Sequence, residues 1–449
     1  MFTFIKRLFG GGKSPSTASP VSPEKAHPAP SPAAQRVQPN LPAVPPIPTV
    51  CQREEIIDAR MRIAGYRFSV SRADTGKPAE PGTAIEVLAA NNVAAFAERR
   101  IALIDLSPDL LGKHDYRRLA GVNAAFLLPS PANEGELTAW LGIVAEVRQT
   151  GAKIAIRDSS SGSLRAALLA QADFLLLNFA GYSLVNLEKA IGLLRVEHPT
   201  LQLIADSVSH WPEYRYCVSH GVAYCCGAFA TQQDAEQATG EISQSRLVLI
   251  EMLNQLRKDV DLGDIVEVAK RDPGVVVAII AMANSPALGM SRSVISVDQA
   301  IFVLGREQLY RWLSIAIFKA GSASPRDEVL LELALARGRF LELVSSEHSS
   351  KQESDELFLL GLLSLLDCLL GVPMAAVVER IHLSPALKEV LLTSSGPLAR
   401  HLMLAIAVEK GHVDNTARLS EQLGYGLERI EYASMEALQW AESAVQLSN

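Results

Sequence analysis

Six charged or polar residues stand at the ends of strands predicted in the first half of the chain: Arg67, Asp105, Arg157, Asp158, Asn178 and Asp206. In parallel α/β barrels the reacting groups stand at the carboxyl ends of the strands. Carboxylates gathered there can hold two divalent cations about 3.5–4 Å apart for phosphoryl chemistry. The two arginines allow two other interpretations. They could bind a phosphate without metal, or they could pair with the aspartates and fill an inactive pocket.

Strand-length and helix-length segments alternate between residues 51 and 240, and this region must position the six side chains. Helix-length segments such as 136–149 and 184–197 lie between strands predicted at 62–68, 101–106, 124–128, 153–156, 174–177, 203–205 and 222–225. This rhythm predicts a parallel sheet, open or closed into a barrel. A complete barrel of this type needs about 250 residues, so the region of about 190 residues is predicted to be a degenerate or shortened TIM-like (β/α) barrel.

The second half, residues 245–449, shows helical segments and no strand pattern, which predicts one all-α domain. Asp272 precedes a proline, a typical helix start, and the run 275–283 is apolar on every face, so we expect that helix to be buried all round. Ser296 and Gln299 form a capping box for the next helix. Gly305 is expected to end it.

Residues 1–50 differ in composition from the rest and are predicted to be a disordered tail. Positions 10–50 hold 11 of the 24 prolines, so the segment buries too little surface to offset its chain entropy. Apolar residues of the segment 1–13 share one helical face beside Lys6 and Arg7. Weak contact of this segment with an anionic membrane is one interpretation, and a frayed terminus is the other.

The bulk composition points to a cytoplasmic protein, with peripheral contact to the inner membrane as an additional expectation. The net charge of −7 does not favour nucleic-acid binding. No secretory signal precedes the five cysteines, so they are expected to be reduced thiols. The longest apolar run, 357–370, is too short and too interrupted to span a bilayer.

Two ordered sets of motifs resemble known families. Asp272-Pro273, Asn284-Ser285 and Leu304-Gly305 resemble the core of an HDOD domain, a helical relative of the HD hydrolases that usually lacks their metal ligands. The first half resembles an EAL domain, a barrel that hydrolyses cyclic di-GMP with two divalent metals. The resemblance lies in Gly65-Tyr66, Asp105 to Pro108, Ile204 to Val208, Gly221 and Gly227. Taken together, the order of motifs resembles EAL–HDOD fusions of the YuxH-like type.

The chain departs from the EAL pattern where that family keeps its chemistry. Arg67-Phe68-Ser69 stands where the resemblance implies Glu-Ala-Leu, and Asp105 replaces the metal-binding Asn. The paired aspartates fall at Arg157 and Asp158, and the catalytic Lys falls at Leu176. The late Glu is Asp206 and the last Gln is Cys226. Because arginine does not deprotonate and repels cations, we expect no metal, no cofactor and no catalysis.

The resulting hypothesis is a bacterial signalling or scaffold protein that works by protein–protein interaction in a cyclic di-GMP-linked network, such as those for motility, biofilm or stress. In the helical half, Asn284, Ser285 and Arg311 are candidate partner contacts, with helix capping as the structural alternative. A metal-independent cyclic di-GMP receptor is the main rival function. An active phosphodiesterase is the second rival, and nucleic-acid binding by the basic tail is the third.

Overall fold

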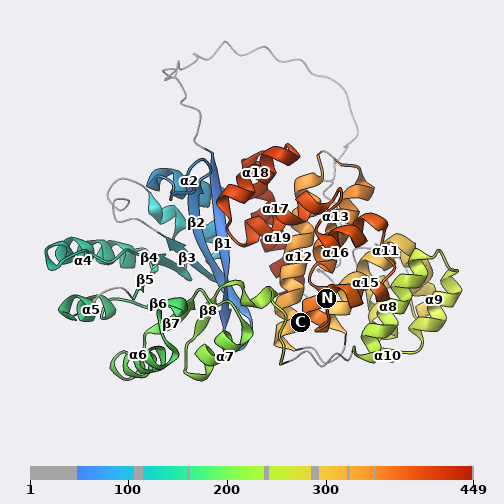
Figure 1. Cartoon of the computed structure of the whole chain (residues 1–449), viewed down its shortest axis with the longest axis horizontal. Helices are drawn as coiled ribbons and strands as arrows, with labels where there is room; N and C mark the ends of the chain where they lie inside the picture. The colour runs from blue at the N-terminus through green and yellow to red at the C-terminus, as the bar shows by residue number, and fades with distance from the viewer. Residues whose placement is uncertain are drawn as a thin grey trace, which may run out of the picture.

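The computed structural model describes residues 48–105, 115–158, 162–236, 242–284, 293–320, 324–347 and 349–446. Most of the predicted disordered tail, including its proposed membrane segment 1–13, lies outside these residues, as does Ser285. The described chain forms a β-barrel surrounded by helices and, beside it, a larger assembly of helices (Figure 1).

Eight strands close into a barrel in sequence order. They are β1 (Thr49–Asp58), β2 (Ile63–Arg72), β3 (Ile101–Asp105), β4 (Ala124–Leu127), β5 (Lys153–Arg157), β6 (Phe174–Asn178), β7 (Gln202–Asp206) and β8 (Tyr224–Cys226). β2 to β8 are parallel, while β1 runs antiparallel to both of its neighbours, β2 and β8. The predicted barrel is confirmed, with β1 as an additional strand that the sequence reasoning missed.

All eight strands of the barrel are present, but the described residues between β3 and β4 contain no α-helix. Its outer helices are α2 (Pro81–Ala90), α3 (Val93–Phe96), α4 (Glu134–Gln149), α5 (Gly162–Leu169), α6 (Leu184–Glu197) and α7 (Trp211–Ser219). Between β3 and β4 the described residues form only the 3-10 helix η2 (Tyr116–Leu119), and after β8 comes another, η4 (Ala228–Thr231). This shortened unit accounts for part of the small size of the region.

A compact apolar core fills the inside of the barrel. Alternate strand positions point inward, and they place one buried cluster inside: Ile56, Ile101, Leu103, Ala125, Leu127, Ala155, Phe174, Leu176, Ile204 and Cys226. β2 approaches β3 so closely at Gly65 that a Cβ there would lie 2.0 Å from the carbonyl oxygen of Ile101. Glycine is therefore required at this position for steric reasons.

The helical region begins at residue 244 and comprises α8 (Gln244–Arg257), α9 (Leu262–Ala269), α10 (Pro273–Ala283), α11 (Val297–Lys319), α12 (Pro325–Ser345), α13 (Lys351–Leu363), α14 (Leu366–Leu370), α15 (Met374–Arg380), α16 (Pro385–Thr393), α17 (Ala399–Glu409), α18 (Val413–Leu423) and α19 (Leu427–Gln446). Asp272 and Ser296 cap α10 and α11 as predicted. Gly305, with φ 64°, interrupts α11 at the expected point. The expectation that α10 is buried all round is wrong, because Val277 is 66% exposed.

The two parts pack directly against each other. β1 contacts α17, α18 and α19 (Figure 1), and one continuous apolar cluster includes residues from the barrel helices and from the helical region. Among the described residues, no single helix combines the length and hydropathy needed to cross a bilayer, although the bent pair 351–370 and 374–380 passes that test jointly.

Candidate functional site at the barrel mouth

Five charged side chains occupy inward-facing positions at one end of the barrel, and we call them the mouth cluster: Glu54, Arg67, Asp105, Arg157 and Asp206. Asp105, Arg157 and Asp206 each lie two residues beyond an interior apolar side chain of the same strand, so the strand alternation directs them inward. Glu54 reaches the same end because β1 is antiparallel, and it lies opposite Arg67 in the strand register.

Arg67 is the centre of the mouth cluster. Its Nε and Nη2 atoms donate to the two carboxylate oxygens of Asp105 at 3.2 and 2.9 Å. Its Nη1 donates to Asp206 at 3.3 Å and lies 3.6 Å from Glu54. The side chain is only 17% exposed, so these charge-assisted contacts are partly shielded from water.

Arg157 closes the cluster from β5. Its Nη1 donates to the same oxygen of Asp206 at 3.1 Å, and its Nη2 lies 3.5 Å from Asp105. With 45% of its side chain exposed, Arg157 forms the outer rim, above the more buried Arg67. Both arginines singled out in the sequence therefore pair with the neighbouring aspartates in this structure.

The mouth cluster contains two guanidiniums and three carboxylates. Burial, followed by the charge of Asp206, raises the pKa of Glu54 to about 6, with Arg67 opposing the shift. Burial works against the charged form of Arg67, but its hydrogen bond to Asp105 and the nearby carboxylates raise its pKa above the usual value. The arginine is therefore a permanent cation at the centre of the site.

The mouth cluster does not fit the two-metal centre that an EAL phosphodiesterase would require. Arg67 bonds to both Asp105 and Asp206, so a cation bound by these carboxylates would have to displace a guanidinium. Within the described residues, no group of three or more His, Cys, Asp or Glu side chains is arranged to hold a metal ion. The predicted absence of hydrolysis remains a prediction that activity measurements must test.

Asp158 lies apart from the mouth cluster, whereas Asn178 lies at its edge. The Asp158 carboxylate accepts a hydrogen bond from Arg165 at 3.0 Å and another from the Tyr182 hydroxyl. Burial and this hydrogen bond raise the pKa of Tyr182 to about 12. Asp158 thus serves the packing of α5 against the barrel. Asn178 is exposed at the end of β6, opposite Asp206 in register, and so remains available at the rim.

Glu54 is the member of the mouth cluster that sequence reasoning missed. It lies on β1, whose sequence from Thr49 to Asp58 shows no clean alternation of apolar and polar residues. The one available signal was the pair Ile56-Ile57 two residues later, which marks a buried strand segment. Only the closure of the barrel brings Glu54 beside Arg67.

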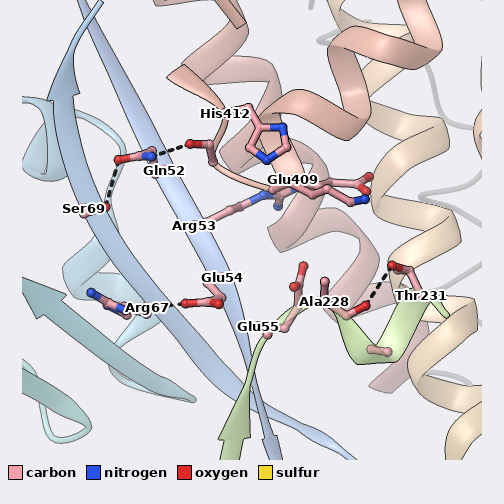
Figure 2. Close-up of a pocket in the computed structure, with 14 residues that line it drawn as sticks. Gln52, Arg53, Glu54, Glu55, Arg67, Ser69, Ala228, Thr231, Glu409 and His412 are labelled. Carbon is pink, nitrogen blue, oxygen red and sulfur yellow. Dashed lines mark hydrogen bonds and ion pairs between the residues drawn. The ribbon is translucent and has the colours of Figure 1, made fainter. Parts of the chain in front are cut away.

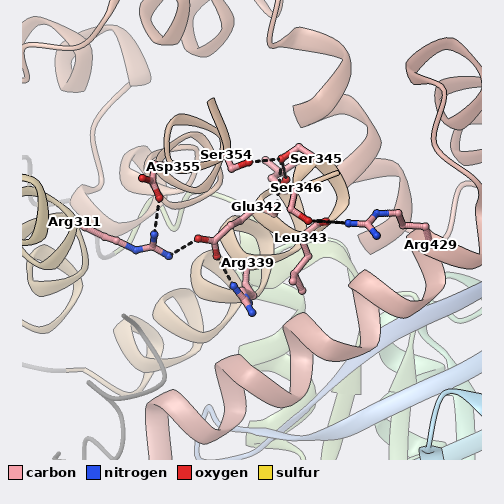
Figure 3. A network of polar contacts seen from close by, with 10 residues as sticks. Arg311, Arg339, Glu342, Leu343, Ser345, Ser346, Ser354, Asp355 and Arg429 are labelled. Atoms are coloured by element: carbon pink, nitrogen blue, oxygen red, sulfur yellow. Dashed lines mark hydrogen bonds and ion pairs between the residues drawn. The ribbon is translucent and has the colours of Figure 1, made fainter. Parts of the chain in front are cut away.

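The candidate contacts of the helical region prove to be internal. Arg311 donates to Asp355 and to Glu342, both at 2.9 Å (Figure 3). Its guanidinium also lies 3.9 Å from the ring centroid of Phe358. Asn284 donates to the carbonyl of Val294 at 2.6 Å and accepts from its N–H at 2.7 Å, which ties the end of α10 to residue 294. Asn284 is the C-cap of α10 and so matches the structural alternative of helix capping. Arg311 lies within α11 and takes part in an ion-pair network instead.

The barrel and the helical region together define a class of protein. The chain has an EAL-like barrel followed by a helical region in which residues 243–376 match the family model of the HDOD domain. The resemblance seen in the motifs is thereby confirmed for both halves.

The chain is also similar in sequence to two curated proteins. The chain is 26% identical over 248 residues to the uncharacterized protein YuxH of Bacillus subtilis, covering 54% of this chain and 59% of YuxH. It is 23% identical over 267 residues to the cyclic di-GMP phosphodiesterase CdgJ of Vibrio cholerae, covering 59% of this chain and 61% of CdgJ. The chain therefore spans about three fifths of the length of both relatives.

Solved structures that match the chain include a cyclic di-GMP-bound EAL protein from Vibrio cholerae O395. The TM-score is 0.34 at 15% identity, with 40% of this chain and 90% of that chain covered. The EAL domain of Xanthomonas citri FimX, in complex with cyclic di-GMP, matches with a TM-score of 0.30 at 14% identity and covers 40% of this chain and 85% of that chain.

Proposed function

We propose that this chain is a cytoplasmic, non-catalytic signalling protein of a cyclic di-GMP-linked regulatory network, such as one for motility, biofilm or stress, and that it acts by binding partner proteins. The supporting observation is the mouth cluster, in which Arg67 bonds to both aspartates that a metal centre would need. A guanidinium cannot release a proton to make room for a divalent cation, and its charge repels one. Such a barrel retains its fold and loses its hydrolytic role.

The close packing of the two halves supports a role in which the state of one domain changes the affinity of the other domain for a partner protein. Gln52 on β1 accepts hydrogen bonds from Ser69 and Ser71 at 3.2 and 2.8 Å, and it donates to the carbonyl of Gly411 at 2.5 Å. A displacement of β1 at the barrel mouth would therefore move the segment between α17 and α18. Coupling of this kind needs contacts that differ between two states of the protein.

A direct activity measurement tests the non-catalytic part of the proposal. The purified full chain, incubated with cyclic di-GMP and either Mg²⁺ or Mn²⁺, should yield no linear product under conditions in which an active EAL enzyme hydrolyses the substrate completely. Metal-dependent turnover that scales with protein concentration and disappears in Asp206→Asn would refute the proposal, because that substitution removes a carboxylate and leaves the barrel core unchanged.

A capture experiment tests the binding part. Exposed apolar side chains on neighbouring helices of the HDOD region, such as Val277 on α10 at 66% and Phe302 on α11 at 59%, give protein contacts a physical basis. A protein captured from the native cell should form a defined complex with the purified chain, weakened in Phe302→Asp and unchanged in Val196→Asp. Val196, 81% exposed on α6 of the barrel, is the matched control. Failure to reconstitute any complex from purified components would count against the proposal.

A metal-independent cyclic di-GMP receptor is the second candidate, and the rim favours it. Arg157 keeps 45% of its side chain exposed, and Asn178 is exposed on the next strand, so both can reach a phosphate above the cluster. Calorimetry should then show micromolar binding of cyclic di-GMP that is lost in Arg157→Ala and in Arg67→Ala. An absence of binding by the wild-type chain eliminates this candidate.

A further inference from the structure

A cavity of about 460 Å³ lies between the barrel and the HDOD-containing region. Its lining comes from β1, β2, η4 and the end of α17 with the segment that follows it (Figure 2). β1 supplies Arg53 and Glu55, η4 supplies Thr231, and the end of α17 and the segment after it supply Glu409, Lys410 and His412. Cavities of this size accommodate small molecules in other proteins. Glu54 and Arg67 of the mouth cluster also line the cavity, so it borders the barrel mouth.

Arg53 is the unusual feature of this cavity. The residue is only 5% exposed, and its Nε and Nη1 atoms are buried without a hydrogen-bond partner among the described residues. Buried guanidiniums are normally paired, because an unpaired buried charge is costly. The unpaired donors therefore indicate an acceptor that comes from outside the chain.

The charges around the cavity leave a positive excess for such an acceptor. Glu409 is already engaged by Arg337, whose Nε and Nη2 donate to its two oxygens at 2.9 and 2.6 Å. Burial raises the pKa of Glu55 to about 7, so its negative charge is incomplete at neutral pH. Lys410 is exposed at the edge of the cavity, and within the described chain no carboxylate lies within ion-pair distance of it.

We propose that this interdomain cavity binds a small anion, whose phosphate or carboxylate oxygens accept hydrogen bonds from Arg53 and whose remaining charge is balanced by Lys410. The ligand would touch both parts of the chain, so its binding stabilises their packed arrangement. The site borders the barrel mouth through Glu54 and Arg67. Its donors differ from those of the mouth, because Arg67 and Arg157 are already paired with aspartates whereas Nε and Nη1 of Arg53 are not. A small molecule bound in this cavity would act on the protein even if no ligand binds at the mouth cluster.

Titration of the full chain with inorganic pyrophosphate tests the proposal. Pyrophosphate at millimolar concentration should raise the melting temperature of the wild-type chain and bind with a stoichiometry of one. Arg53→Gln should weaken binding by about tenfold or more, since it removes hydrogen bonds from a charged donor. Arg62→Gln, at an exposed arginine of the same barrel, is the matched control and should bind like the wild type.

Two further measurements keep the test decisive. Without pyrophosphate, Arg53→Gln should melt at or above the wild-type temperature, because an unpaired buried cation has been removed. This result also shows that the variant folds.

Titration with citrate tests a carboxylate ligand in the same way. Cyclic di-GMP binding that is lost in Arg53→Gln and kept in Arg157→Ala would assign the nucleotide phosphate to this cavity. Wild-type chain that binds neither pyrophosphate nor citrate, or binding unchanged in Arg53→Gln, overturns the proposal.

Discussion

Arg100, just before β3 of the barrel, donates two hydrogen bonds to the carboxylate of Glu332 in α12, at 2.6 and 3.0 Å. Its Nε also lies 3.3 Å from Glu442 in α19. Both glutamate side chains are at most 5% exposed, so Arg100 joins two buried carboxylates of the helical region. Arg99 also donates to Glu442, at 3.1 Å. This contact makes the stability of each part depend on the other.

Arg100→Ala should therefore destabilise the whole chain. The substitution leaves Glu332 and Glu442 with a weakened set of partners, and breaking a buried pair in this way costs about 3–5 kcal/mol. Urea denaturation followed by circular dichroism measures the change. Arg118→Ala removes an exposed partner of Glu86 and should cost less than about 1 kcal/mol. Equal effects of the two substitutions would contradict the interdomain role of Arg100.

Two glycines should respond to alanine in opposite directions. α12 and α13 touch at Gly361, where a Cβ would lie 2.4 Å from the Cα of Gly338. Gly361→Ala should destabilise the chain by about 1–3 kcal/mol through overpacking. Gly142→Ala, in α4, meets nothing within 4 Å and should stabilise by about 0.5–1 kcal/mol because alanine is the better helix former. Thermal unfolding of both variants checks the pair, and a stabilising Gly361→Ala would mean that the helices do not pack this closely.

The free energy of unfolding should vary with pH because Glu431 titrates at a different pH in the folded and unfolded states. This α19 side chain accepts the N–H of Cys51 at 3.0 Å, and burial raises its pKa to about 7 from an ordinary value of 4.5. The folded state then binds the proton more tightly than the unfolded state does. The contribution of Glu431 to stability is therefore fully present below about pH 4.5. This contribution is lost as the pH rises to about 7.

Glu431→Gln keeps an acceptor for Cys51 and removes the titration. At pH 8 the variant should be more stable than the wild type by about 1–2 kcal/mol, and the difference should shrink towards pH 5. Glu421→Gln, at an exposed position of the preceding helix α18, is the control and should follow the wild type at every pH. The measurement is urea denaturation at pH 5, 6, 7 and 8. A difference that grows towards low pH would contradict the assigned direction.

Removal of Arg67 should expose a cation site that the wild-type chain lacks. In Arg67→Ala, the carboxylates of Glu54, Asp105 and Asp206 lose their shared partner, and stability should fall by about 3 kcal/mol. Mn²⁺ should then raise the melting temperature of the variant through its affinity for the folded state. The wild type and Arg72→Ala, which removes a surface pair with Asp74, should not respond. Stabilisation of the wild type by Mn²⁺ would contradict the occupation of the site by Arg67.

Local sequence signals predicted much of the fold and part of the site. Asp105, Arg157 and Asp206 were found because each follows a short apolar strand, and strand alternation then sets the inward direction of the side chain. The caps at Asp272 and Ser296 and the break at Gly305 were equally local features. Asp158 could not be placed in this way, because its direction is decided by Arg165 and Tyr182 on neighbouring segments.

The sequence by itself determined the class of each half, the strand ends that carry charge and the presence of two arginines among the aspartates there. The tertiary structure alone decided that β1 closes the barrel and carries Glu54 to Arg67, that Arg311 is held inside a network, and that Arg53 faces a cavity shared by both halves. The physical reason is the range of the interactions. Periodicity and capping depend on neighbours a few residues apart, whereas the pairing of charges depends on residues that only the closed and packed fold brings together.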